Sequence, residues 1–208
     1  MKNKSVIEKN WKVILAEIFS WAFFPPLVAT VFFTFLVFWY SEDLSQGLQW
    51  LVTVSPFLIF FPLIFFAASL KLGWISDIDL SDRRERPYFL SVFLISLAAA
   101  IILLYFLDVP QKFLAYAVSG FVITIIAAVI TLFWKISFHT AITSSVFAAI
   151  VILGGTRFLP LLLLIIPIGW SRLVLKKHTF WQVVGGTLLA FLVTGTVFYL
   201  FGFSTLTV

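Results

Sequence analysis

The sequence predicts an all-α integral membrane protein: a bundle of six or seven transmembrane helices preceded by an interfacial amphipathic helix. Its 208 residues are 62% hydrophobic and 11% charged, with a mean hydropathy of +1.12. A soluble domain averages about 45–50% apolar and about 25% charged residues, and a small one has too much surface to hide this many apolar side chains. The apolar residues form continuous runs, not the alternating pattern of a membrane β-barrel. These observations argue against a soluble enzyme, a disordered protein or a nucleic-acid-binding protein.

The first 19 residues differ from the rest of the chain because lysines are interspersed with apolar residues. The lysines are Lys2, Lys4, Lys9 and Lys12, and the apolar residues include Val6, Ile7, Trp11, Val13, Ile14 and Ile18. This pattern is typical of a helix that lies on the membrane surface. We therefore expect an interfacial helix over 1–19 and one transmembrane domain over 20–208.

Seven apolar runs follow, and a helix of about 20 apolar residues crosses the hydrocarbon core. The runs are 20–40, 50–70, 88–107, 113–134, 139–155, 158–174 and 179–201. The runs 139–155 and 158–174 are shorter and are separated by the turn sequence Gly154-Gly155-Thr156-Arg157. The sequence therefore predicts seven spans, with six as the alternative.

The basic residues predict an orientation. With the N-terminus inside, 12 of the 14 Lys and Arg residues lie on the cytoplasmic side, and only Lys112 and Arg157 lie outside. Cytoplasmic segments of membrane proteins carry such an excess of Lys and Arg. We expect a protein of the cell (plasma or inner) membrane with a cytoplasmic N-terminus.

Ionisable residues near membrane depth usually mark function, and here they gather in three clusters. The clusters span 71–86, 135–139 and 172–182. Two spans separate the first cluster from the second, and two more separate the second from the third. An even number of crossings returns the chain to the same face, so all three clusters are expected to meet on one side of the membrane.

The contents of the clusters indicate phosphate chemistry. The two histidines of the chain, His139 and His178, each lie beside a serine and a cation. Arginine binds phosphate oxygens through a planar fork, and histidine acts as acid, base or nucleophile near neutral pH. The chain has no cysteine. This combination predicts a phosphoryl-transfer site without metal or other cofactor.

The same residues resemble the type 2 phosphatidic acid phosphatases, whose motifs are K-x6-R-P, P-S-G-H and S-R-x5-H-x3-D. Ser171-Arg172, five residues and then His178 match the third motif; Ser137 and His139 match the second in part; Arg86-Pro87 match the first. All three occur in the family's order.

The chain also departs from the family pattern. Asp79 stands where the first motif has Lys, and Arg83 or Arg84 could supply the missing cation. Ile136 and Phe138 replace the Pro and Gly of the second motif, and two helices separate motifs that many members join by a short loop. Gln182 replaces the Asp of the third motif, which is similar to dolichyl-diphosphatase-like members.

The resemblance implies a mechanism. His178 would attack phosphorus and form a phosphohistidine, Gln182 would hold its ring, and His139 would act as acid and then base. The residues that would bind phosphate oxygens are Arg86, Arg172, Ser137, Arg83 and Ser171. The expected partners are the bilayer and a lipid substrate, with a slight preference for an isoprenyl diphosphate over phosphatidate; the oligomeric state is not predicted.

Two alternatives remain open. The Asp-rich loop of Asp77, Asp79 and Asp82 resembles the first motif of membrane aromatic prenyltransferases, in which carboxylates hold Mg²⁺ against a prenyl diphosphate. We favour instead that these carboxylates pair with neighbouring arginines and keep the loop folded. The second alternative is a phosphatase-like protein that binds lipid phosphates without hydrolysing them.

Overall fold

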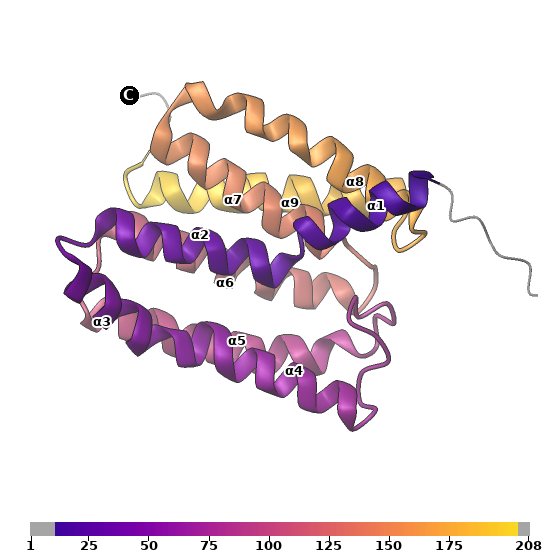
Figure 1. The fold of residues 1–208 in the computed structure, drawn as a ribbon, viewed down its shortest axis with the longest axis horizontal. Helices are drawn as coiled ribbons and strands as arrows, with labels where there is room; N and C mark the ends of the chain where they lie inside the picture. Colours follow the sequence, from indigo (N-terminus) through magenta and orange to yellow (C-terminus); the bar gives the residue numbers. More distant parts are fainter. Residues whose placement is uncertain (1–10, 204–208) are drawn as a thin grey trace, which may run out of the picture.

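The computed structural model describes residues 11–203, and all regular secondary structure within them is helical (Figure 1). The helices are, in chain order, α1 Trp11–Ala22, α2 Pro25–Tyr40, α3 Leu44–Ser55, the π-helical turn η1 Pro56–Phe60, α4 Phe61–Lys71, α5 Arg86–Phe106, α6 Gln111–Thr131, α7 Phe138–Gly154, the 3-10 segment η2 Thr156–Leu164, α8 Ile165–Val174 and α9 Phe180–Leu200. The predicted all-α class is confirmed.

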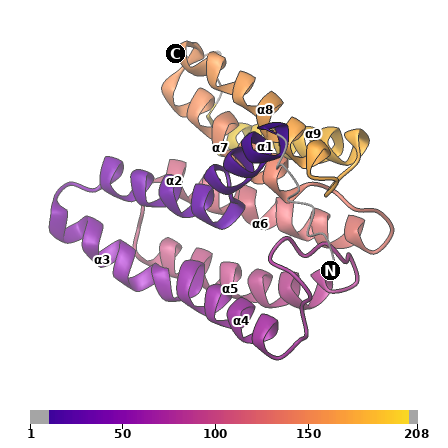
Figure 2. The same cartoon turned by 45° about the vertical axis from the view of Figure 1, so that its right-hand side comes forward.

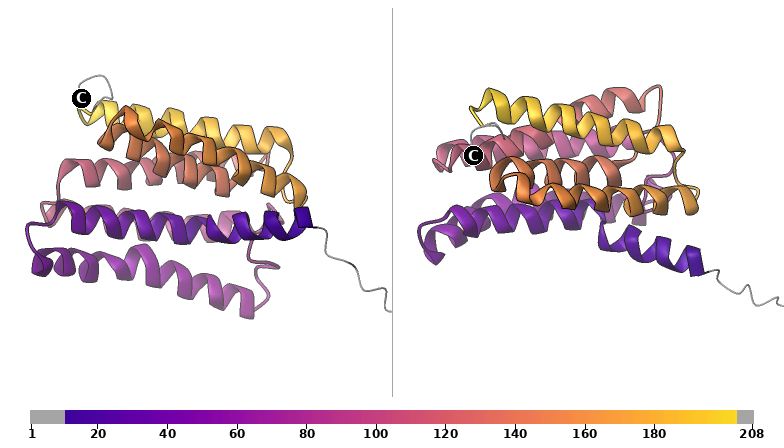
Figure 3. Two further views of the ribbon diagram at one scale, coloured as in Figure 1. Left: turned by 45° about the horizontal axis from the view of Figure 1, so that its top comes forward. Right: turned by 90° about the horizontal axis from the view of Figure 1, so that it is seen from above.

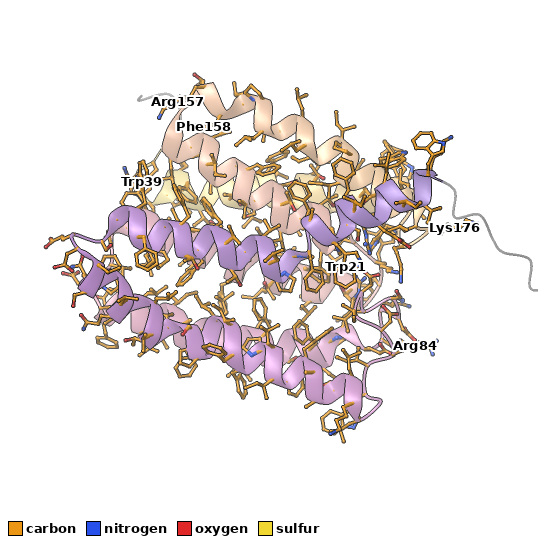
Figure 4. The ribbon with its side chains drawn as sticks, in the orientation of Figure 1. Trp21, Trp39, Arg84, Arg157, Phe158 and Lys176 are labelled. Atoms are coloured by element: carbon orange, nitrogen blue, oxygen red, sulfur yellow. The ribbon has the colours of Figure 1, made fainter. Side chains whose placement is uncertain are left out.

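The helices run back and forth between two ends of a bundle (Figures 1 and 3). We call the end formed by the loops 72–85, 132–137 and 175–179 the site end. It lies to the right in Figure 4, where Arg84 and Lys176 mark it, while Trp39, Arg157 and Phe158 mark the opposite end. All three polar clusters lie at the site end, as the parity of the crossings predicts.

By length and apolar composition, the described helices support the alternative of six spans. Five helical stretches of the described chain are long and apolar enough to cross a membrane, and the α1–α2 pair, bent by 41°, would make a sixth. The remaining run, α7, is a helix of only 17 residues, about 26 Å at about 1.5 Å per residue. It is surrounded by α2, α6, α8 and α9, and a helix inside the bundle need not match the thickness of the hydrocarbon core.

The N-terminal helix extends past its predicted boundary and packs against the bundle. α1 extends from Trp11 to Ala22, across the expected boundary at residue 19. It packs against α8 through a face that includes the buried Ala16 and Ser20, and Figure 2 shows it close to α8 and away from α3 and α4. Lys2, Lys4 and Lys9 lie outside the described residues, so the interfacial location of this segment stays a prediction.

The start of α9 is fixed against the start of α7. A Cβ on Gly186 would lie 2.6 Å from the carbonyl oxygen of Ser137, so only glycine allows this approach. The backbone N–H of Ser137 donates to the carbonyl of Gln182 over 3.1 Å, and the Thr140 hydroxyl donates to the carbonyl of Val183 over 3.1 Å. These contacts bring the second and third clusters together.

Candidate active site

The spacing between Arg172 and His178 is that of one tight turn at the end of α8. Lys176 adopts a left-handed conformation, with φ of 54°, which ends many helices. The N–H groups of Lys177 and His178 both donate to the carbonyl of Arg172, over 3.0 and 3.2 Å. Thr179 then caps α9. The turn therefore folds His178 back beside Arg172, next to the bundle.

Gln182 orients the ring of His178 through a hydrogen bond, the contact that the resemblance predicts. Nδ1 of His178 lies 3.2 Å from Oε1 of Gln182, which also accepts the backbone N–H of Thr179 over 3.1 Å. Because the Thr179 N–H needs an acceptor, the Gln182 atom is the amide oxygen, so Nδ1 carries the hydrogen. Nε2 of His178 is left with its lone pair.

The surroundings favour the neutral form of His178. Burial is the main cause that lowers its pKa to about 3, and the cations of Lys135, Arg172 and Arg86 add to the effect, while the hydrogen bond to Gln182 opposes it. A histidine with such a pKa is unprotonated at neutral pH. The imidazole is therefore available as a nucleophile.

Arg172 lies at the centre of the cluster and is 1% exposed. Its NH2 group donates to Oδ1 of Asp79 over 2.7 Å, and its NH1 group donates to the hydroxyl of Ser20 over 2.5 Å. Its Nε has no hydrogen-bond partner among the described residues. The Nε–NH2 edge is one of the two edges that can bind a phosphate through two parallel bonds, and here only its NH2 group is occupied.

Asp79 occupies the position of the family's lysine and makes contacts of the opposite sign. Its Oδ2 lies 3.0 Å from Nζ of Lys177, while Oδ1 binds Arg172. Burial alone would raise the pKa of Asp79, but Arg172 and Lys177 outweigh it and hold the pKa below its ordinary value. The first cluster thus contributes an anion that binds the cations of the third.

Arg86 joins the first cluster to the second and is also 1% exposed. Its Nε donates to the carbonyl of Leu80 over 3.0 Å and its NH1 to that of Ile136 over 3.1 Å. The guanidinium lies 5.1 Å from the ring centre of Phe138. Arg86 therefore fixes the loop 132–137 ahead of His139, and its predicted contact with phosphate stays a prediction.

The other predicted phosphate ligands have protein partners in this structure. Ser137 caps α7 by accepting the N–H of Thr140, and the Ser171 hydroxyl donates to the carbonyl of Ile168 over 2.7 Å. Arg83 donates to the carbonyl of Leu132 at the end of α6. These contacts are structural, and the predicted binding of phosphate by the three residues is not tested by them.

The Asp-rich loop is folded largely by its own carboxylates. Asp77 accepts the N–H of Asp79 over 2.8 Å and the hydroxyl of Ser81 over 3.0 Å, and Asp82 accepts the N–H of Arg84 over 2.9 Å. The expectation of pairing with neighbouring arginines is thus wrong in detail: Asp79 pairs with Arg172, 93 residues away. Within residues 11–203, no three His, Asp or Glu side chains are grouped so as to hold a metal ion.

A cavity of about 210 Å³ opens beside His139. Its lining comes from α1 and the α1–α2 bend, the loop 72–85, the start of α7 and the turn after α8: Glu17, Ser20, Trp21, Phe24, Ile78, Asp79, His139, Leu175 and Lys177. Nε2 of His139 lies 3.5 Å from the hydroxyl of Ser20. The contribution of α1 to this cavity was not predicted from the sequence. The signal for it is a carboxylate and a hydroxyl, Glu17 and Ser20, three residues apart in an apolar segment.

Comparison with protein families agrees with this geometry. Residues 132–206 match the PAP2 superfamily, and this stretch contains the second and third clusters. The resemblance to type 2 phosphatidic acid phosphatases is thereby confirmed over these residues, while the first cluster lies ahead of the matched stretch. Neither the curated proteins nor the solved structures contain a match to the chain.

Proposed function

We propose that this helical membrane protein, whose residues 132–206 match the PAP2 superfamily, is a phosphatase acting on a lipid phosphate or an isoprenyl diphosphate. The observation that carries the proposal is the orientation of His178. Its Nδ1 is tied to Gln182, its Nε2 keeps the lone pair, and Arg172 lies beside it with a half-occupied anion fork. These are the parts of a phosphohistidine mechanism.

In the first step, Nε2 of His178 attacks phosphorus and forms an N–P bond, while the P–O bond to the leaving group breaks. His139 donates a proton to the leaving oxygen. The negative charge of the bound phosphate supplies the counter-charge that a protonated His139 needs. The Nε–H of Arg172, which has no hydrogen-bond partner among residues 11–203, would donate to a phosphoryl oxygen as charge shifts in the transition state.

In the second step, water attacks phosphorus and His139 takes its proton. The N–P bond breaks, its electron pair returns to Nε2 of His178, and inorganic phosphate leaves. One histidine thus acts as acid and then as base, which splits a difficult hydrolysis into two easier steps.

The cavity beside His139 suits the leaving group. Trp21, Phe24, Ile78 and Leu175 give its walls an apolar part, while His139 and Lys177 give it a polar one. The lipid-side oxygen would lie next to His139 and the first part of the hydrocarbon chain between α1 and the loop 72–85. We place the site end on the cytoplasmic face, on the basis of the excess of Lys and Arg there.

The test is phosphate release by the detergent-purified full chain. We would offer an isoprenyl diphosphate and phosphatidate, each with excess chelator, to the wild type and to His178→Ala, with Arg157→Ala at the opposite end as the control. Release that survives the chelator, disappears in His178→Ala and persists in Arg157→Ala is expected. Consumption of the diphosphate that requires both Mg²⁺ and an acceptor would indicate a prenyltransferase. No reaction with any substrate would indicate a protein that binds lipid phosphates without hydrolysing them.

The phosphoenzyme separates the roles of the two histidines. With a labelled phosphate ester whose leaving group needs no proton, His139→Ala should still form the N–P bond but hydrolyse it slowly. An acid-labile, base-stable label should therefore accumulate in His139→Ala and be absent from His178→Ala. Accumulation in His178→Ala instead would contradict the assignment of the nucleophile.

A further inference from the structure

We infer that Ser20 of α1 is a positioning residue for the phosphate site, an inference that rests on the proposed function. Its hydroxyl contacts both Arg172 and His139, residues 152 and 119 positions away in the chain. α1 therefore completes the site.

The chemistry of the Ser20 hydroxyl, the Arg172 guanidinium and the His139 imidazole determines which group donates each hydrogen bond. A guanidinium only donates, so the Ser20 oxygen accepts from NH1 of Arg172 over 2.5 Å. The Ser20 O–H is then free to donate to Nε2 of His139, 3.5 Å away, when that ring is neutral. When His139 is protonated, Nε2–H becomes the donor and the second lone pair of Ser20 accepts it. The hydroxyl thus fits both proton states of His139 without moving Arg172.

The packing of α1 on α8 holds Ser20 next to Arg172. Pro25 and Pro26 start α2 and the chain bends by 41° between the two helices, so α1 leaves the axis of α2 and packs on α8, which carries Arg172. Figures 1 and 2 show α1 and α8 side by side. Ser20 is buried in this contact, whereas Trp21, the next residue, is 61% exposed.

Ser20 also decides which donors of Arg172 remain for a ligand. With NH1 held by Ser20 and NH2 by Asp79, the guanidinium plane is fixed and Nε is left for a phosphoryl oxygen. Without the hydroxyl, the plane would be held at one corner only. The loss should appear mainly in the transition state, in which both Arg172 and His139 act, and so in kcat more than in KM.

The test compares Ser20→Ala, Ser20→Thr and Ser119→Ala in the full chain. Ser119 is the matched control, since its buried hydroxyl donates to the Ala115 carbonyl of its own helix, over 2.8 Å. Ser20→Ala should lower kcat by roughly 10- to 100-fold, the effect of losing a hydrogen bond to a charged group, with KM changed less than about threefold. Ser20→Thr, which keeps the hydroxyl, should recover most of the rate, and Ser119→Ala should equal the wild type.

A second measurement keeps this inference apart from the proposed function. Orthovanadate binding, followed by its stabilisation of the protein against thermal unfolding, needs no turnover. We expect weaker binding in Ser20→Ala than in wild type and Ser119→Ala. Wild-type hydrolysis together with unchanged kcat in Ser20→Ala would overturn the role of Ser20 and leave the phosphatase standing. If the wild type hydrolyses nothing, vanadate binding decides: weaker binding in Ser20→Ala supports the inference, and equal or absent binding overturns it.

Discussion

Gln182 is the residue at which this chain departs most informatively from the family's third motif. Its amide oxygen fixes the tautomer of His178 as a carboxylate would, but it adds no negative charge. The pKa of His178 consequently stays low, at about 3, under the influence of burial and of Lys135, Arg172 and Arg86. The substitution preserves the orientation of the ring and favours its neutral form.

Replacing Gln182 by Glu should therefore move the acid limb of the pH profile. A carboxylate beside Nδ1 stabilises the imidazolium and raises the pKa of His178. As the pH falls, the neutral nucleophile is therefore protonated at a higher pH in the variant than in the wild type. We expect the acid limb of kcat/KM to shift upward in Gln182→Glu, measured between pH 4 and 8. The matched control is Gln46→Glu, because Gln46 accepts a backbone N–H at the start of α3 in the same way. An unchanged profile in Gln182→Glu would mean that the acid limb reports the protonation of a group other than His178.

Asp79 should contribute stability that depends on pH. It forms ion pairs with the buried Arg172 and with the partly exposed Lys177, and its pKa in the folded protein lies below the ordinary value of 3.8. Its contribution is thus fully present above that ordinary value and is lost as the pH falls through the lowered one. Asp79→Asn should cost about 2 kcal/mol at neutral pH, the usual effect of losing a hydrogen bond to a charged group, and the difference from wild type should shrink below about pH 4.

Chemical or thermal unfolding in detergent at pH 7 and at acid pH would measure this difference. Asp82→Asn, in the same loop, is the control, because an amide oxygen can still accept the N–H of Arg84. A difference for Asp79→Asn that persists unchanged at acid pH would mean that the side chain acts through packing and not through its charge.

At the scale of the helices, the site depends on the close approach of α7 and α9. The hydrogen bonds from Ser137 to Gln182 and from Thr140 to Val183 require the backbones to meet at Gly186. The adjacent glycines Gly185 and Gly186 indicate close packing in general. They do not indicate that Gly186 faces the Ser137 carbonyl, because that partner lies 49 positions away.

Gly186→Ala should therefore push the start of α9 away from the start of α7. The added Cβ would lie 2.6 Å from the Ser137 oxygen and 3.0 Å from Oγ1 of Thr140, and such overpacking costs about 1–3 kcal/mol. We expect a lower melting temperature and a loss of phosphate release. Gly195→Ala is the control on the same helix: nothing lies within 4 Å of its Cβ, and alanine favours a helix by up to about 1 kcal/mol. Equal effects of the two changes would argue against the packing explanation.

At the scale of the whole molecule, the sequence predicts which segments are helices and which end of the bundle carries the site. Both follow from local composition and from the parity of the crossings. It does not predict that α1 reaches the site, nor that Asp79 binds Arg172 and not a nearby arginine. Those pairings join residues 93 to 152 positions apart, and only the packing of α1 on α8 and of the loop 72–85 on the turn after α8 brings them together.

The two ends of the helical bundle should lie on opposite sides of the membrane. The chain has no cysteine, so single cysteines report unambiguously. Arg84 is exposed at the site end and Arg157 at the opposite end (Figure 4). With the site end cytoplasmic, an impermeant maleimide should label Arg157→Cys on intact cells and Arg84→Cys only after the membrane is opened. The reverse pattern would place the site outside and would require the substrate to be presented from the outer leaflet. Labelling of both positions from one side would contradict the bundle's passage across the membrane, because the helices that separate these residues run from one end to the other.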